Sequence, residues 1–371
     1  MQKANETVLE INLDALGNNY RYLTSKLKKE TKVLTVVKAF GYGSDSVAVA
    51  NELATLGADY FAVAYSSEGE TLRNAGVKTP ILVFHTLQTH FDTIINRCLE
   101  PNLYSKKILK DFITVAEKHQ QTAYPIHLKF NTGLNRLGFI KEDISFIAEE
   151  LSKTKSVKVK SVFSHLVASN DKNEAEFTKK QIEDFRNISE ELIEKIGYKP
   201  LLHMVNTSGI INYPEAQFDM VRAGIGLYGF ANDKEENKNL QPVAILKTII
   251  SQIHNISPGE SVGYNRGFIA KEATKTATLP IGHADGISRA YGNGKGWVSI
   301  HGKKAFILGN VCMDMIMVDV THIDCDEGDE VIVFGDNPTA NELSATINSI
   351  PYELLTSISQ RIKRVVLEKA K

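Results

Sequence analysis

Short, solidly apolar runs alternate with longer amphipathic segments through the first two-thirds of the sequence. Polar residues, Gly or Pro bound the runs, which is typical of strands that are covered on both faces. Eight such runs recur at intervals that average about 26 residues, the spacing of βα units. We predict strands at Val33–Val37, Phe61–Ala64, Ile81–Phe84, Asn102–Tyr104, Ile126–Phe130, Val159–Ser164, Leu202–Val205 and Met220–Arg222.

Helices are predicted between these strands, for example over residues 46–56, 106–119 and 173–196. In the last of these segments apolar side chains recur at roughly helical spacing, which predicts one buried face. Eight βα units in about 230 residues predict an α/β fold with an N-terminal (β/α)8 barrel of the TIM type. An open, doubly wound parallel sheet is the structural alternative.

The pattern changes after residues 231–240, a charged segment with few apolar residues that is typical of a linker. Short strand-like runs separated by Gly-rich turns follow, at residues 243–254, 274–280, 297–300, 304–308, 316–320 and 330–334, with helical segments at 340–348 and 352–361. We therefore expect two domains, with residues 1–235 as the barrel and residues 236–371 as a mostly β domain.

Composition narrows the function classes without identifying a chemistry. Of the 371 residues, 43% are hydrophobic and 23% are charged, as in ordinary globular proteins. The 43 Lys and Arg side chains nearly balance the 44 Asp and Glu side chains, and the net charge of -1 favours neither nucleic acid nor an anionic membrane as a partner. The three cysteines lie far apart, and no apolar stretch reaches the roughly 18 residues that span a bilayer. We expect a cytoplasmic protein with reduced thiols, no membrane segment and no metal site.

Basic side chains and Gly-containing loops follow several predicted strands. The basic residues at or just after strand ends are Lys38, Lys129, Arg136, His165 and Arg222. In a (β/α)8 barrel the chemistry lies at the C-terminal strand ends, so these side chains are expected on one face. Backbone N–H groups in the loops after strands seven and eight would add a phosphate site there. A lysine beside a phosphate site suggests pyridoxal phosphate bound covalently to that lysine.

Nine motifs give the sequence a resemblance to a known family. In chain order they are VVKAFGYG, HLKFNTGLNRLG, VFSHL, NTSG, VRAGIGLYG, SVGYNRGF, GHADG, NVCMD and PYELLTSISQR. They span both predicted domains, and the whole chain resembles the alanine racemase family of pyridoxal-phosphate enzymes. The resemblance implies interconversion of L-alanine and D-alanine, with D-alanine supplied for cell-wall peptidoglycan.

By this resemblance, Lys38 binds the cofactor and faces one side of the substrate Cα, while Tyr264 is the second base on the opposite side. The partner subunit supplies Tyr264, which implies a homodimer with shared active sites. Both side chain types ordinarily titrate near pH 10, so each needs a lowered pKa to act as a base at neutral pH. Nearby positive charge lowers both pKa values, and His165 and Arg222 are the candidate cations.

The resemblance implies roles for the remaining residues as well. Arg222 is expected to face the pyridine nitrogen, which stays unprotonated because a guanidinium cannot accept a proton. Arg136 and the Met313 backbone of the partner would contact the substrate carboxylate. Lys129 is expected to be carbamylated, which lets it orient Arg136, and an ordinary lysine paired with a carboxylate is the alternative. The full set of cofactor-binding residues is Lys38, Tyr42, His165, Ser208, Arg222, Gly224, Ile225 and Tyr352.

Several positions depart from the usual family motifs. Phe40 and Gly41 replace Asn-Ala after the cofactor lysine, Asn131 replaces an aspartate, and His283 replaces a tyrosine that narrows substrate access. Tyr291 could partly substitute for that tyrosine. These changes put gate polarity, pH dependence and substrate breadth in question, but not the reaction type.

Other functions are alternatives to alanine racemisation. A racemase of broader specificity, or a serine racemase, would share the architecture, but the presence of both Lys129 and Arg136 favours alanine. A pyridoxal-phosphate-dependent amino-acid decarboxylase would lack this pair and the Tyr264 motif. A non-catalytic pyridoxal-phosphate carrier would have a barrel without a second domain, and a generic barrel enzyme would bind no cofactor.

Overall fold

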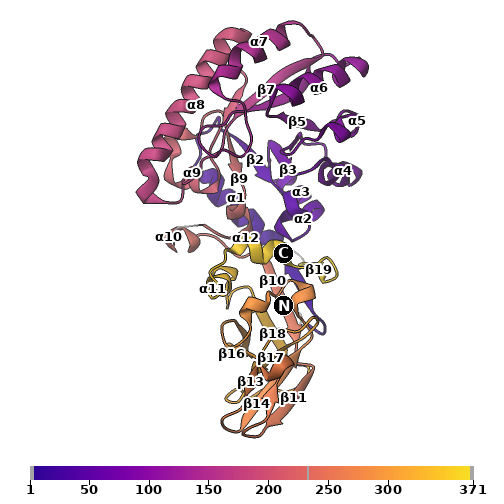
Figure 1. Ribbon diagram of the computed structural model, residues 1–371, viewed down its shortest axis with the longest axis vertical. Coiled ribbons are helices and arrows are strands. Elements are labelled where there is room, and N and C mark those ends of the chain that lie inside the picture. The colour runs from indigo at the N-terminus through magenta and orange to yellow at the C-terminus, as the bar shows by residue number, and fades with distance from the viewer. Residues whose placement is uncertain (1–3, 232–233, 368–371) are drawn as a thin grey trace.

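A computed structural model describes residues 4–231 and 234–367 of the protein. Its two main parts lie one after the other along the long axis: a closed barrel of eight parallel strands with its helices, and a nine-stranded sheet (Figure 1). The prediction of an α/β fold with an N-terminal (β/α)8 barrel and a mostly β second domain is confirmed, and the alternative of an open doubly wound sheet is wrong.

The barrel closes where β2 pairs with β9, with Lys32 opposite Met220. Its strands are mostly apolar because the barrel interior covers one face and the helices cover the other. Each of the eight predicted strands overlaps an observed one. The observed strands are β2 (Lys32–Val36), β3 (Tyr60–Val63), β4 (Ile81–Val83), β5 (Glu100–Leu103), β6 (Tyr124–Lys129), β7 (Val157–Phe163), β8 (Leu201–His203) and β9 (Met220–Ala223).

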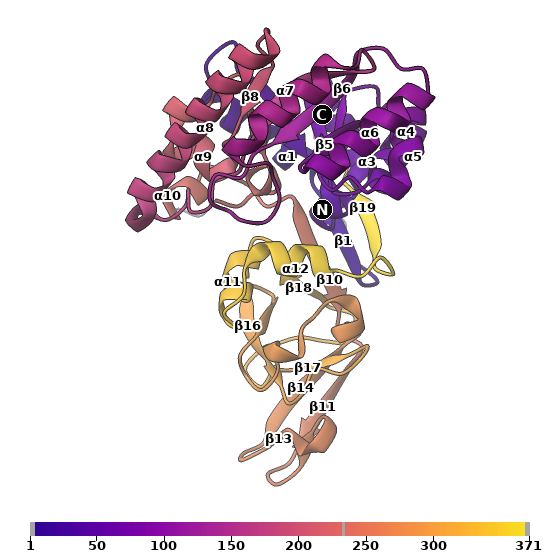
Figure 2. The ribbon, with the colours of Figure 1, turned by 45° about the horizontal axis from the view of Figure 1, so that its top comes forward.

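Helices surround the barrel (Figure 2). Local signals explain where they begin and end. The Ser105 hydroxyl accepts a hydrogen bond from the Ile108 N–H at the start of α6, and Gly197, with a φ of 75°, caps the C-terminus of α8. The helices of this part are α1 (Leu13–Ser25), α3 (Ser46–Thr55), α4 (Ser66–Asn74), α5 (Phe91–Asn96), α6 (Lys106–Lys118), α7 (Ile144–Ser152), α8 (Ala175–Ile196) and α9 (Thr207–Asn212).

The second part is a mixed sheet in the order β11–β14–β17–β16–β15–β18–β10–β1–β19. β1 (Val8–Ile11) pairs with β10 and β19, so a segment that precedes the barrel in sequence belongs to this sheet. The other strands are β10 (Ala244–Ile249), β11 (Gln252–Ile256), β14 (Thr274–Leu279), β15 (Trp297–Ile300), β16 (Lys303–Leu308), β17 (Ile316–Asp319), β18 (Glu330–Phe334) and β19 (Lys363–Val366), and β12 (Ser261–Val262) pairs separately with β13 (Phe268–Ile269).

The predicted single strand over residues 243–254 is wrong, because the chain changes partners at its middle. The Ile250 N–H donates to the Asp329 carbonyl at 3.0 Å, and the next N–H, of Ser251, donates to the Thr278 carbonyl at 2.8 Å. The predicted linker contains the short helix α10 (Lys234–Asn237), and its residues 232 and 233 lie outside the described residues. The domain boundary between residues 235 and 236 stays a prediction.

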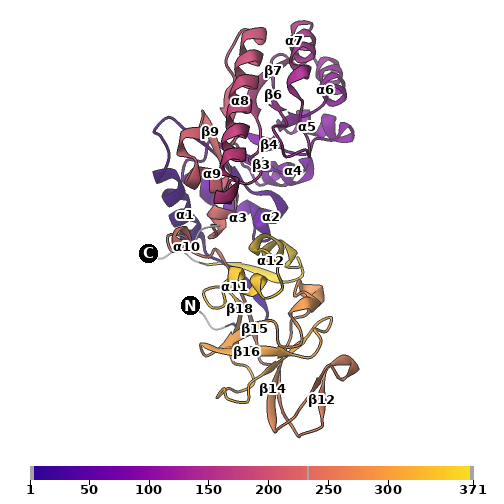
Figure 3. The ribbon, with the colours of Figure 1, turned by 60° about the vertical axis from the view of Figure 1, so that its left-hand side comes forward.

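Two helices near the C-terminus, α11 (Ala340–Ala345) and α12 (Pro351–Ser357), lie where the two parts meet (Figure 3). α12 packs against α2 (Lys38–Tyr42), the turn that directly follows the first barrel strand. No helix within residues 4–231 and 234–367 is long and apolar enough to cross a bilayer. The same residues contain no group of three or more His, Cys, Asp and Glu side chains arranged to hold a metal ion.

Candidate active site at the barrel mouth

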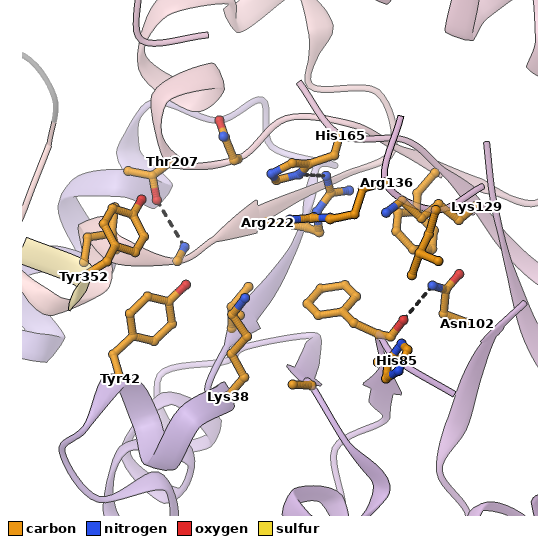
Figure 4. A pocket seen from close by; sticks show the side chains of 18 of the residues that line it. Lys38, Tyr42, His85, Asn102, Lys129, Arg136, His165, Thr207, Arg222 and Tyr352 are labelled. Atoms are coloured by element: carbon orange, nitrogen blue, oxygen red, sulfur yellow. Dashed lines mark hydrogen bonds between the residues drawn. The ribbon is translucent and has the colours of Figure 1, made fainter. Parts of the chain in front are cut away.

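A cavity of about 370 Å³ lies at the C-terminal ends of the barrel strands (Figure 4). Most of the predicted site residues line it together, although they come from widely separated parts of the sequence. They are Lys38, Tyr42, Lys129, Arg136, His165, Ser208, Arg222, Gly224, Ile225 and Tyr352. The remaining two predicted residues, Tyr264 and Met313, lie elsewhere.

Lys38 reaches into the cavity from a turn of left-handed helix (Figure 4). The residues Ala39, Phe40 and Tyr42 have φ angles of 53°, 57° and 55°, which residues with a Cβ rarely adopt. The turn ends at Gly43, which has a φ of 82° and donates its N–H to the Ala39 carbonyl at 2.7 Å. Because such strain persists only where the surroundings enforce it, the turn fixes the position of the lysine.

Glu68, in the first turn of α4, links the left-handed turn after Lys38 to the end of β3. Its carboxylate accepts hydrogen bonds from the Ala39 N–H and the Ala64 N–H, both at 2.6 Å. Burial, and then Arg136, lower the pKa of Lys38 against the opposite effect of Glu68. A lowered pKa increases the population of the neutral amine, the form that attacks a carbonyl or accepts a proton.

A recess lined by hydroxyl groups forms one end of the cavity. Tyr42 stacks on Tyr228 with ring centroids 4.4 Å apart, and its centroid lies 6.0 Å from that of Tyr352. Burial raises the pKa of Tyr352 to about 12 and that of Tyr42 further, so both are neutral hydroxyl groups. The Gly224 N–H donates to the Thr207 hydroxyl at 3.1 Å, and a Cβ on Gly224 would lie 2.9 Å from the Tyr42 oxygen. This narrow, donor-rich recess suits a phosphate group.

Arg222 is buried in the wall of the cavity, and both of its terminal nitrogens are engaged. One donates to His203 Nδ1 at 2.8 Å. The other donates to the carbonyls of Ser164 and Met204, both at 2.7 Å, and to His165 Nδ1 at 3.0 Å. Since these four acceptors, from the ends of β7 and β8, surround the guanidinium, its plane has one orientation.

His165 is neutral, which corrects one prediction. Burial first, and then the positive charges of Arg222 and Arg136, hold the pKa of His165 well below its usual range. The prediction that His165 serves as a cation is therefore wrong, because its environment excludes a second positive charge. The cation that lowers the pKa of Lys38 is Arg136.

Lys129 ends β6 and is buried, with Arg136 nearby on the same wall (Figure 4). Burial, followed by Arg136 and Arg222, lowers the pKa of Lys129 to about 8. Among the described residues no carboxylate contributes to this shift, so the alternative of a lysine paired with a carboxylate lacks its carboxylate. A neutral amine is the form of lysine that reacts with carbon dioxide.

Asn102 is a cavity residue that the sequence reasoning missed. Its Nδ2 donates to the Phe84 carbonyl at 2.7 Å, while its buried Oδ1 has no hydrogen-bond partner among the described residues. His85 lines the same region and its ring lies parallel to that of Tyr104, with centroids 6.3 Å apart. A polar residue inside a predicted barrel strand is the signal that could have identified Asn102.

Tyr264 and Met313 lie together on the second part of the molecule. They line a separate hollow of about 540 Å³, with exposed fractions of 70% and 59%. Tyr264 begins η6 (Tyr264–Arg266), and the following strand β13 lies toward the end of the molecule away from the barrel (Figure 1). The structure of one chain therefore does not bring these residues to the cavity, and their roles stay predictions.

His283, the predicted gate residue, is exposed on η7 (His283–Asp285). It lines a further hollow of about 300 Å³ together with Tyr291, and the Tyr291 side chain is buried. Neither residue lines the barrel cavity of its own chain. The effects of His283 and Tyr291 on substrate access stay predictions.

Comparisons with known proteins agree with this arrangement. Residues 11–232 match the family model described as alanine racemase, N-terminal domain, and residues 243–366 match the one described as alanine racemase, C-terminal domain. Alanine racemase 2 of Caldanaerobacter subterraneus subsp. tengcongensis is 34% identical over an alignment 371 positions long, which covers 97% of this chain and 95% of that protein.

Solved structures are similar over the same length. The alanine racemase of Clostridium difficile 630 has a TM-score of 0.92 at 32% identity and is matched over 99% of this chain and 97% of its own. The alanine racemase of Bartonella henselae with covalently bound pyridoxal phosphate has a TM-score of 0.90 at 27% identity, over 98% and 100% of the two chains. Since family models and relatives match in both parts and over nearly the full length, this chain belongs to the alanine racemase family.

Proposed function

We propose that the protein binds pyridoxal phosphate and interconverts L-alanine and D-alanine. The observation that carries the proposal is the convergence of Lys38, Arg222 and the hydroxyl-lined recess on one cavity in a member of this family. The Bartonella henselae relative holds pyridoxal phosphate covalently, and the cavity supplies the groups that such a cofactor requires.

The side chains of the cavity fit this cofactor. Lys38 would bind it covalently, His165 and Arg222 would lie along its ring, and the ring nitrogen facing Arg222 would stay unprotonated because guanidinium groups only donate. The residues proposed to hold the phosphate are Tyr42, Ser208, Gly224, Ile225 and Tyr352. The absence of a Cβ at Gly224 leaves the room that a phosphate oxygen needs beside Tyr42. When bound, the cofactor withdraws electrons from the substrate and acidifies its Cα–H bond.

Two bases would act on opposite faces of the substrate Cα. The Lys38 amine would remove or return the proton on one face, aided by its lowered pKa. Tyr264 of the partner subunit would do the same on the other face. Arg136 and the backbone of the partner's Met313 would bind the substrate carboxylate, which is a suitable partner for a guanidinium.

A homodimer with shared active sites completes this arrangement. Tyr264, Met313 and Met315 are large side chains that are exposed on one surface of the second part, where burial against another subunit would be favourable. The cavity contains the Lys38 amine, whereas Tyr264 of the same chain lines a separate hollow. Two copies related by two-fold symmetry would exchange what each lacks.

Lys129 would carry a carbamate. Its pKa of about 8 keeps a substantial neutral fraction, and the flanking guanidinium groups of Arg136 and Arg222 favour a negative charge at this position. Formation joins the lysine nitrogen to the carbon of CO₂ and releases one proton from that nitrogen. The resulting anion would orient Arg136 toward the substrate.

The wider role that follows is supply of D-alanine for peptidoglycan in the cytoplasm. Broader substrate specificity is the second candidate, because His283 offers a smaller and more polar group than tyrosine where family members narrow substrate access. The decarboxylase and the cofactor carrier have weaker support, since Lys129 and Arg136 line one cavity and the second domain is present.

The test is visible spectroscopy of the purified protein with added pyridoxal phosphate, followed by assay of D-alanine formation from L-alanine. Lys38→Ala should remove the absorbance of the covalent complex and lower the racemisation rate by roughly 1,000-fold or more. Lys118→Ala, an exposed lysine of α6, is the matched control and should change neither. Racemisation of L-serine would indicate the broader specificity, and release of CO₂ from L-lysine would indicate a decarboxylase. A protein that stays colourless, or a Lys38→Ala variant with full activity, would refute the proposal.

A further inference from the structure

A line of hydrogen-bonded polar side chains crosses the inside of the barrel, where apolar side chains usually pack. The five residues come from five neighbouring strands, β9 to β5, and all are buried. Arg222 contacts His203 at 2.8 Å, His203 contacts Ser161 at 2.9 Å, Ser161 contacts His127 at 2.5 Å, and His127 contacts Glu100 at 2.7 Å. We call Arg222, His203, Ser161, His127 and Glu100 the interior network.

The direction of the first hydrogen bond follows from the chemistry of Arg222. A guanidinium has donors only, so His203 Nδ1 must accept and cannot carry a proton. Burial and the charge of Arg222 hold the pKa of His203 well below its usual range, so its ring is neutral. Its single proton is therefore on Nε2, which donates to the Ser161 hydroxyl oxygen.

The direction of the next two bonds follows by elimination. Among the described residues, the Ser161 hydroxyl group has hydrogen bonds to the two histidines only, and its oxygen already accepts from His203. Its proton must therefore point to His127 Nδ1, since a buried hydroxyl without an acceptor is costly. His127 then carries its proton on Nε2 and donates it to the Glu100 carboxylate.

Glu100 completes the interior network with a negative charge at the end opposite the guanidinium. It is the first residue of β5, whereas Arg222 is close to the C-terminal end of β9. The network therefore runs from the N-terminal ends of the barrel strands to the cavity at their C-terminal ends. Tyr60 lies beside this carboxylate, and burial together with the Glu100 charge raises the Tyr60 pKa. Every ring nitrogen and hydroxyl group in the network thus has one consistent role.

We infer that Glu100 is a positioning residue for Arg222: through His127, Ser161 and His203 it fixes one tautomer at each histidine and so the direction of the guanidinium. The consequence for the cofactor rests on the proposed function, because Arg222 is the residue proposed to face the ring nitrogen. The tautomers themselves are properties of the protein alone.

The first experiment measures the tautomers directly. Protein labelled with 15N at the histidine rings is studied by NMR as purified and with added pyridoxal phosphate, and His127→Asn assigns the signals. The expected result is a proton on Nε2 alone at both His203 and His127. A proton on His203 Nδ1, or equal protonation of both nitrogens of His203, would overturn the inference without reference to enzymatic activity.

The second experiment tests the coupling with two variants. Ser161→Ala cuts the network without changing any charge, and we expect kcat for L-alanine to fall about 10-fold while KM changes less than about 2-fold. Glu100→Gln, which keeps shape but removes the charge, should lower kcat by a smaller factor. The double variant should be no slower than Ser161→Ala, because the cut already isolates Glu100 from Arg222. If the kcat of the double variant fell by the product of the two single-variant factors, the two substitutions would act independently, which would contradict the inference.

Matched controls separate this result from loss of folding and from failure of the proposed function. Ser189→Ala removes a buried serine hydroxyl from α8, outside the network, and should leave kcat unchanged. Urea unfolding of each variant checks that it is folded. If the protein neither binds pyridoxal phosphate nor racemises alanine, the proposed function fails and the NMR result alone decides the inference. If the protein is active but His203 has the other tautomer, only the inference fails.

Discussion

Arg361 donates two hydrogen bonds to the buried carboxylate of Asp285, from Nε to Oδ1 at 2.6 Å and from Nη2 to Oδ2 at 3.0 Å. The same guanidinium donates to Asp314 at 2.7 Å. Asp285 belongs to the turn that presents His283, and Asp314 directly follows Met313. One arginine therefore joins two segments that the proposed dimer would bring to the partner's cavity. The three charged residues belong to three of the nine motifs, GHADG, NVCMD and PYELLTSISQR.

Replacing this arginine should weaken substrate binding more than the chemistry. In Arg361→Lys a single ammonium cannot reproduce the paired contact with Asp285, so the His283 turn and the Met313 loop lose their common anchor. We expect KM for alanine to rise several-fold with a smaller change in kcat, measured by steady-state kinetics. Arg289→Lys, at an exposed position of the same part, is the control. An unchanged KM would show that the two segments hold their positions independently.

Arg222→Lys should destabilise the barrel even without the cofactor. A lysine cannot reach His203, His165 and the carbonyls of Ser164 and Met204 together, so buried acceptors lose their donor. We expect a loss of about 2 kcal/mol in the free energy of unfolding, measured by urea denaturation after removal of cofactor. Arg186→Lys, on the exposed face of α8, should change it little. Equal effects in the two variants would contradict this account.

The barrel strands and the five basic cavity residues could be predicted because their signals are local. Solidly apolar runs identified β2 to β9, and a residue at a strand end has a known position in a barrel. β1 was not predicted, because its Glu10 breaks the apolar pattern. In the folded protein Glu10 pairs at 3.0 Å with Lys247, another buried charge from a distant strand. Only the tertiary structure supplies that partner.

Other features depend on contacts that no local pattern contains. The residue types of Ala39 and Phe40 do not predict a left-handed turn. They adopt it because neighbouring elements enforce it. His127 and His203 resemble ordinary strand residues until Ser161 is seen between them. The neutral state of His165 was mispredicted because its burial is a property of the fold. Tyr264 and Met313, like the cavity residues Tyr42 and Tyr352, were identified by family resemblance alone.

Gly43→Ala should loosen the contact between the two parts of the molecule. A Cβ there would lie 2.0 Å from the Leu355 carbonyl oxygen of α12, and the residue has a φ of 82°. Gly57→Ala is a matched control, because Gly57 has a φ of 90° but no atom within 4 Å of the added Cβ. Both variants carry the left-handed backbone cost of about 1–2 kcal/mol. Unfolding by urea should show a further loss of about 1–3 kcal/mol for Gly43→Ala alone, and a smaller difference would mean that α12 moves aside easily.

The modification proposed for Lys129 should depend on pH in a defined direction. Its pKa, lowered from 10.5 to about 8, means that the reactive neutral amine is lost as pH falls through 8. We expect the carbamate signal in 13C NMR with labelled bicarbonate to decrease between about pH 8.5 and 6.5. Activity at low pH should recover partly when bicarbonate is added, and Lys129→Ala should lack both signal and recovery. An active protein with an unmodified amine at pH 8.5 would contradict the proposal.

Mixing two inactive variants should restore activity if the sites are shared between subunits. Lys38→Ala disables the cavity of its own chain, whereas Tyr264→Ala disables the cavity of the partner. In a heterodimer both defects therefore fall in one site and the other site is intact. Random exchange at equal concentrations makes about half of the dimers mixed, so we expect roughly a quarter of the activity of the unmodified protein.

Mixing Lys38→Ala with Arg222→Lys, both cavity residues, should give no gain over the two variants assayed separately, because each defect stays in the cavity of its own chain. Failure of the first pair to recover, with subunit exchange verified by mass spectrometry, would place Tyr264 outside the partner's site.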